Sequence, residues 1–131
     1  MVSKTTSNNE ISLEEIIKKA YTRFFFYVAQ ATDTIKAHEL ALLSHRIISK
    51  YFHNLKNFEL DKNGQIKVRD EISVKEILAF SVWMQQFIKE LRKFVIGLGK
   101  IDVKKITAGL ETELQSLNFY EFFEQAAELS Y

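Results

Sequence analysis

The chain has 131 residues, 47% of them hydrophobic, which is enough for one domain with an apolar core. Its 18 basic and 17 acidic residues leave a formal net charge of +1, so the overall charge gives no reason to expect a nucleic acid or an anionic membrane as partner. Because the chain has no cysteine, disulfides, thiolate metal sites and cysteine nucleophiles are excluded.

The N-terminal residues 1–9 are polar and lack the apolar core of a signal peptide, so we expect a disordered leader there. Residues 10–131 then form a single helical-bundle domain. No apolar run reaches the roughly 18–20 residues of a membrane span. We therefore expect a cytoplasmic protein that makes no membrane contact.

Apolar side chains recur at steps of three and four residues, the spacing of one face of an α-helix. The segments that show this spacing are 13–31, 40–58, 77–98, 103–117 and 119–129. The absence of proline leaves few enforced breaks. We predict an all-α bundle of four to five mostly antiparallel helices. The boundary near Thr32 stays open, because nothing there forbids one helix from continuing into the 50s.

Helix starts carry their own signal, a capping residue followed three positions later by an acid. The residues in this pattern are Ser12 with Glu15, Ser73 with Glu76, and Asn118 with Glu121. Asp102 has the capping side chain without the acid. Each of these oxygens can accept a hydrogen bond from a free backbone N–H of the first turn, so we expect helices to begin at these positions.

Residues 58–68 alternate with period two around an Asn-Gly pair, which predicts a short β-hairpin or ordered turn. A three-residue loop ending at Gly64, in the left-handed region, gives the better register. The pairs are then Phe58 with Val68, Glu59 with Lys67, and Leu60 with Ile66. This register gathers the apolar side chains on one face and the opposite charges on the other.

The same segment resembles part of an EF-hand calcium loop, with Asp61, Asn63 and Gly64 at its third, fifth and sixth positions. The calcium ligands that the resemblance implies are Glu59, Asp61, Asn63 and Asp70. Lys67 would stand at the ninth position and the short acid Asp70 at the twelfth, and both weaken a cation site. We expect no metal or other cofactor, and keep a degenerate calcium module as the second alternative.

The histidines His38, His45 and His53 are seven and eight residues apart, on the order of 10–12 Å along a helix. That separation is too long for one metal ion, and we expect a solvated polar face. Arg46 lies seven residues before His53. This Arg-x6-His spacing resembles that of the HEPN ribonucleases, helical domains that cleave RNA across a dimer cleft. The resemblance implies that Arg46 and His53 are catalytic, and we keep it as an alternative.

Other catalytic signatures are missing: the sequence has no glycine-rich phosphate loop, no Gly-x-Ser-x-Gly and no His-Glu-x-x-His. The charges, however, are unevenly placed. Segment 89–105 carries a net charge of +4, and segment 106–131 carries −5. We expect adjacent helices to neutralise each other. The alternative is a basic patch for an acidic partner or a nucleic-acid backbone, formed by Lys89, Arg92, Lys93, Lys100, Lys104 and Lys105.

Aromatic residues crowd two helices. Residues 24–27 are all aromatic, and their side chains sweep about 300° around the helix, so one packed face cannot bury them all. The last helix repeats the crowding, with four aromatic residues among 119–123. Either the first helix is surrounded, or some rings bury against another chain, and we favour the second. The predicted partner-binding residues are Phe25, Phe26, Tyr120 and Phe123.

These observations favour a non-catalytic helical interaction protein, an adaptor, regulator or subunit. We expect it to form a homo-oligomer or to dock another protein through aromatic helix faces. The alternative is an RNA-directed helical protein, either a HEPN-like ribonuclease or a backbone binder.

Overall fold

The computed structural model describes residues 12–69 and 72–129 and confirms an all-α fold with one small hairpin. The expected leader 1–9 lies outside the described residues. The elements in chain order are α2 (Leu13–Ala31), α3 (Thr34–Ser49), the 3-10 helix η1 (His53–Asn57), β1 (Phe58–Leu60), β2 (Ile66–Val68), α4 (Lys75–Phe94), α5 (Val103–Ile106), α6 (Glu111–Ser116) and α7 (Phe119–Ala126).

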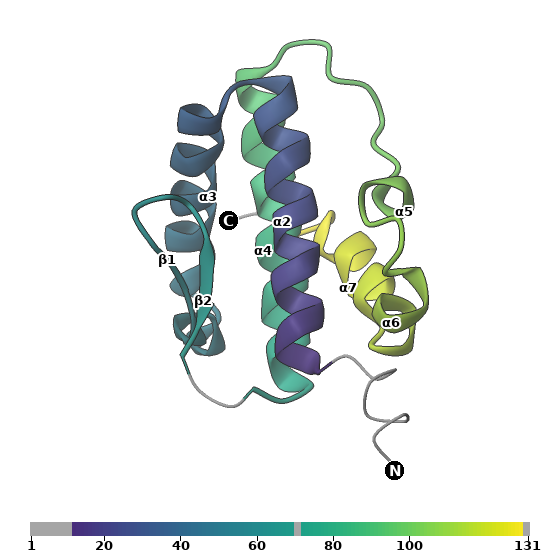
Figure 1. The fold of residues 1–131 in the computed structure, drawn as a ribbon. Coiled ribbons are helices and arrows are strands. Elements are labelled where there is room, and N and C mark those ends of the chain that lie inside the picture. The colour runs from purple at the N-terminus through teal and green to yellow at the C-terminus, as the bar shows by residue number, and fades with distance from the viewer. Residues whose placement is uncertain (1–11, 70–71, 130–131) are drawn as a thin grey trace.

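The central element is α4, with α2 in front of it, α3 and the hairpin along one side, and α5, α6 and α7 along the other (Figure 1). Most of its side chains are buried, among them Phe80, Trp83 and Phe87. Each such ring contributes roughly 1.5–3 kcal/mol through burial. The buried Gln85 side chain donates a hydrogen bond to the Phe123 carbonyl at 2.7 Å.

The open boundary near Thr32 is a real helix break. α2 ends at Ala31 and α3 begins at Thr34. The Asp33 carboxylate accepts a hydrogen bond from the backbone N–H of Lys36 at 2.7 Å, which caps α3. The Thr32 hydroxyl donates to the carbonyl of Val28 at 2.7 Å and closes the last turn of α2.

The predicted helix over 40–58 is too long, because α3 ends at Ser49. Phe52 is extended, and a 3-10 helix follows. The turn brings Leu55 and Phe58 back into the core, where both are fully buried.

The predicted hairpin and its register are confirmed: Phe58 faces Val68, Glu59 faces Lys67, and Leu60 faces Ile66. Gly64 lies in the left-handed region with φ +82°. The Asp61 carboxylate accepts hydrogen bonds from two loop N–H groups, those of Asn63 at 2.8 Å and Gln65 at 2.9 Å. The Tyr21 hydroxyl donates to the Gly64 carbonyl at 2.8 Å and ties the loop to α2.

The predicted helix over 103–117 is divided into α5 and α6. Gly109, with φ +93°, lies between them in a conformation that an α-helix cannot continue. The Thr107 hydroxyl donates to the carbonyl of Val103 at 2.8 Å and lies 2.7 Å from the Tyr120 hydroxyl. The break lets Leu110 and Leu114 both reach the core.

Two of the predicted helix caps are confirmed. The Ser12 hydroxyl accepts from the Glu15 N–H at 3.1 Å, and the Asp102 carboxylate accepts from the Lys105 N–H at 3.3 Å. At Asn118 the predicted capping box is wrong. Asn118 is left-handed, with φ 64°, and its side chain makes no capping bond, because it forms the tight turn between α6 and α7.

Ser73 and Glu76 form only half of the predicted capping box. The Glu76 carboxylate accepts from the N–H and the hydroxyl of Ser73 at 2.7 and 2.9 Å. The reciprocal contact differs, because the Glu76 N–H donates to the Ser73 carbonyl. Asn54 also donates to Glu76, at 2.9 Å, so this carboxylate joins η1 to the start of α4.

Candidate interaction surface

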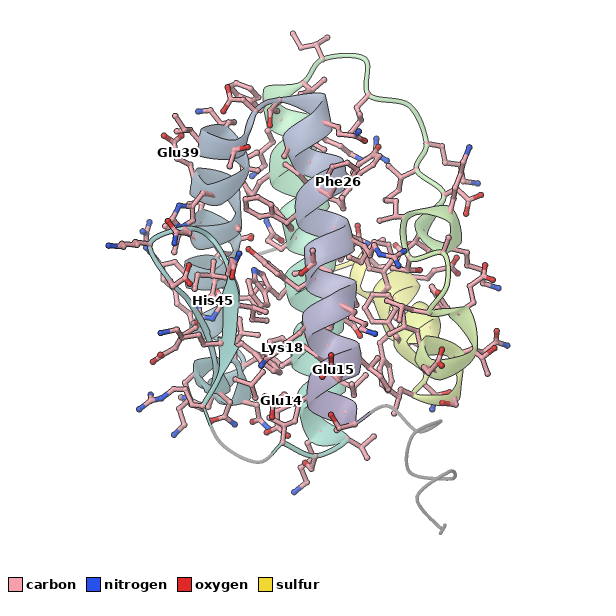
Figure 2. The ribbon with its side chains drawn as sticks, in the orientation of Figure 1. Glu14, Glu15, Lys18, Phe26, Glu39 and His45 are labelled. Carbon is pink, nitrogen blue, oxygen red and sulfur yellow. The ribbon has the colours of Figure 1, made fainter. Side chains whose placement is uncertain are left out.

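The four consecutive aromatic residues of α2 have different surroundings. Phe24 is fully buried, Phe25 and Tyr27 are half-buried, and Phe26 is 60% exposed. Elements α3, α4, α5 and β2 all contact α2, so this helix is surrounded to a greater extent than we expected. Phe25 packs within the chain against Gly64 of the hairpin loop. The rings of α2 therefore leave only Phe26 largely open to a partner (Figure 2).

The expectation that Tyr120 and Phe123 bind a partner is wrong. Both are buried inside the chain, with 9% and 4% of their surface exposed. The Phe123 ring lies 5.7 Å from the Phe24 ring between centroids. Helix α7 directs its aromatic face into the core and its glutamates outward. Of the four predicted partner-binding residues, Phe26 is the one that the fold leaves accessible.

Phe26 lies in an open cleft of about 580 Å³ between α2 and the segment that contains α5. We call this cleft the α2–α5 groove. Its lining includes Arg23, Phe26, Gln30, Lys100, Asp102 and Lys105. The groove thus brings Phe26, one of the predicted partner-binding residues, next to Lys100 and Lys105 of the predicted basic patch. These two lysines are far from Phe26 in the sequence.

The electrostatic character of the α2–α5 groove is positive. Arg23 donates to the carbonyl of Ala108, so its guanidinium is positioned without being neutralised. The Asp102 carboxylate accepts a helix-capping bond from the backbone N–H of Lys105, and its negative charge offsets one of the three cations in the lining. Over the described residues, neither Lys100 nor Lys105 forms an ion pair. An acidic group would therefore meet a net positive charge next to an exposed ring.

The remaining predicted basic residues do not share this groove. Lys93 pairs with Glu90 at 3.2 Å, and Arg92 donates to the carbonyls of Leu98 and Gly99. Lys89 donates to the backbone carbonyl of Ala126 at 3.3 Å. The pKa of Lys89 is lowered, chiefly by burial. Their contacts are structural, so the six residues do not form one continuous basic patch.

The predicted catalytic pair Arg46 and His53 lies on two elements, α3 and the start of η1, and both residues are exposed. The expected alignment along one helix face is wrong, because α3 ends between them. The sequence spacing assumed one continuous helix through Arg46 and His53, and the chain does not form that helix.

The expectation of a solvated histidine face is wrong for His45. Its Nε2 lies 2.7 Å from the Phe58 carbonyl and 3.2 Å from that of Leu55, and its ring packs edge-on against Trp83 at 4.8 Å (Figure 2). Burial lowers the pKa of His45, while the two carbonyls and nearby Glu59 oppose that shift. His45 therefore has a structural position between α3, β1 and α4.

The residues of the calcium alternative lie on a β-hairpin. Glu59 is on β1 and forms an ion pair with Arg69 at 3.3 Å. Asp61 binds the backbone of its own loop, and these hydrogen bonds, that from Gln65 first, lower its pKa. Asp70 lies outside the described residues. Within 12–69 and 72–129, no group of three or more histidines or acids could hold a metal ion.

Comparisons with known proteins identify no relative: no family model, no curated protein and no solved structure matches this chain. Among the helices that the structure describes, none is long and apolar enough to cross a bilayer.

Proposed function

We propose that this chain is a non-catalytic interaction protein of the cytoplasm that binds a protein partner in the α2–α5 groove. The observation that carries the proposal is the position of Phe26, a large ring 60% exposed beside three cationic side chains. Aromatic side chains and arginine are enriched at protein interfaces relative to the rest of the protein surface.

The chemistry of the groove defines the partner. Phe26 and the half-buried Ile101 and Ile106 supply an apolar floor. Lys100 and Lys105 supply positive charge that no ion pair with a described residue neutralises. The fitting ligand is therefore an acidic segment that carries one apolar or aromatic side chain, which would pack on Phe26 while its carboxylates meet the lysines.

The same observation favours a second candidate, a single-stranded nucleic acid, because such sites also combine cations with a stacking ring. The groove has one largely exposed ring, Phe26, and one half-buried ring, Tyr27, whereas stacking along a strand uses several open rings. We therefore rank the acidic protein partner first and make the nucleic acid an arm of the test.

Fluorescence anisotropy with three labelled probes tests the proposal. The probes are a glutamate-rich peptide with one central phenylalanine, the same peptide with lysine in place of glutamate, and an oligouridine. We expect the acidic peptide alone to bind, and Phe26→Ser to weaken it by at least about fivefold.

Ile35→Ser is the matched control, since Ile35 is 75% exposed on α3 and does not line the groove. Binding that is unaffected by Phe26→Ser, or equally weakened by Ile35→Ser, would show that the groove is not the site. Binding of the oligouridine in preference to the acidic peptide would replace the protein partner with a nucleic acid.

A further inference from the structure

The outer face of α7 and the short helix α6 form an acidic surface. Glu121 and Glu124 are three residues apart on α7, within about 60° of one helical face, and Glu128 follows in the turn after the helix. All three are exposed, while the opposite face of α7 is buried against the core. Glu111 and Glu113 of α6 precede them. We call these five glutamates the acidic face.

The acidic face has no compensating charge of its own. Residues 106–131 contain five glutamates and neither lysine nor arginine. No described glutamate of this face forms an ion pair with a described lysine or arginine. Over residues 12–69 and 72–129, the expected neutralisation between adjacent helices therefore does not occur through ion pairs, although Glu128 has an electrostatic influence on Lys89.

The acidic face and the α2–α5 groove are neighbours. A hollow of about 440 Å³ between α5 and α7 is lined by Lys100 and Lys104 on one side and by Tyr120 and Glu124 on the other. The Lys104 ammonium lies 5.4 Å from the centre of the Tyr120 ring. Lys100 lines both this hollow and the groove, so positive and negative surfaces adjoin along α5. Figure 1 shows α5 and α6 on the same side of α2.

We infer that the occupant of the α2–α5 groove is the acidic face of a second copy of this chain. This inference rests on the proposed function, because it names the partner of the same groove. Two adjacent patches of opposite charge are self-complementary about a twofold axis that passes between them. The groove of each chain then contacts the acidic face of its partner, so the dimer has two equivalent contacts.

A twofold arrangement accounts for both unpaired charge sets at once. The groove lysines gain carboxylates, the glutamates gain cations, and Phe26 is covered in both copies. An unrelated acidic protein would cover the groove and leave the acidic face without partners. The charge complementarity on one surface therefore favours a closed dimer.

Sedimentation equilibrium of the full chain is the first test. We expect a dimer at low salt that dissociates as the salt rises from about 0.05 M to about 0.5 M, since screening weakens exposed charge pairs. A chain that stays monomeric at all protein concentrations in low salt would overturn the inference. If the acidic peptide still binds that monomer in the groove, the proposed function stands without it.

A charge-swap pair is the decisive test. One variant carries Lys100→Glu with Lys105→Glu, and the other carries Glu121→Lys with Glu124→Lys. All four side chains are exposed, so we expect both variants to fold, which circular dichroism verifies. Each variant alone should dimerise at least about tenfold more weakly, because like charges then face each other in both contacts.

Mixing the two variants in equal amounts should restore a dimer of near wild-type affinity, because every contact in the mixed pair joins opposite charges. Lys56→Glu with Lys62→Glu, at exposed positions beside and within the hairpin, is the matched control and should leave dimerisation unchanged. Variants that dimerise normally, or a mixture that remains monomeric, would overturn the pairing of groove and acidic face.

Discussion

Phe24 and Phe26 are two residues apart on α2, yet one is fully buried and the other 60% exposed. A step of two residues turns the side chain by about 200°, from the core side of the helix to the outside. The Phe24 ring contacts Phe119 and Phe123 of α7, whereas Phe26 lies in the groove beside α5. The same residue type thus contributes to stability at one position and to recognition at the other.

The buried position of His45 makes the stability of the fold depend on pH. Because burial lowers its pKa from the ordinary value of 6.5, the unfolded chain binds a proton at His45 more readily than the folded chain does. Its contribution to the free energy of unfolding is fully present above pH 6.5 and is lost as the pH falls through the folded pKa. We expect urea midpoints to decrease from pH 7.5 to pH 5.

The decrease should be smaller in His45→Asn, which removes this titration. The variants His38→Asn and His53→Asn show the effect of the same substitution at the other two histidines. If the wild-type protein and His45→Asn lose stability in parallel over this range, another group is responsible for the pH dependence.

Among the elements, the hairpin is the best example of local prediction. Alternating polarity on both strands and the left-handed glycine specify one register, and that register is observed. Helices were harder to delimit. The apolar periodicity of 40–58 and 103–117 continues through breaks, because short helices on a common core keep facing the same side. The signal that was missed at the start of α3 is Asp33, a good capping residue.

Gly64, in the hairpin loop, has little room for a side chain. An added Cβ would lie 3.1 Å from Cε2 of Phe25, and the residue has φ +82°. We expect Gly64→Ala to lower the free energy of unfolding by about 1–3 kcal/mol, measured by urea denaturation.

Gly99→Ala is the control for this substitution. A Cβ at Gly99 would meet nothing within 4 Å, so we expect its effect to stay within about 0.5 kcal/mol. Equal losses for the two substitutions would show that the hairpin loop does not constrain the packing of Phe25 on α2.

Helix α4 contacts α2, α3, η1 and α7, and so lies at the centre of the bundle. Trp83 is within ring-contact distance of Tyr21 on α2 and Phe58 on β1, and it donates to Ser44 on α3. On the other side, Phe119 of α7 packs on Phe24 and Phe80. Both halves of the bundle therefore depend on one central helix, and we expect them to unfold together.

Trp83 is the only tryptophan, so its fluorescence reports on one half of the bundle while circular dichroism reports on all helices. We expect the two signals to give coincident transitions. By both signals, Phe119→Ala should lower the free energy of unfolding by about 3–5 kcal/mol. Phe122 is half-buried, so Phe122→Ala should lower it by less. Separate transitions, or a Phe119→Ala shift seen by circular dichroism alone, would mean that α7 folds independently.

The all-α class, the hairpin register and the helix starts at Ser12 and Asp102 could be predicted from the amino-acid order, because they depend on side chains within a few residues of each other. The central place of α4, the burial of Tyr120 beside an open Phe26, and the position of Lys100 near Phe26 became known from the folded chain. Periodicity tells which side of a helix is buried, but not which neighbour covers it. That choice depends on contacts between residues far apart in the chain.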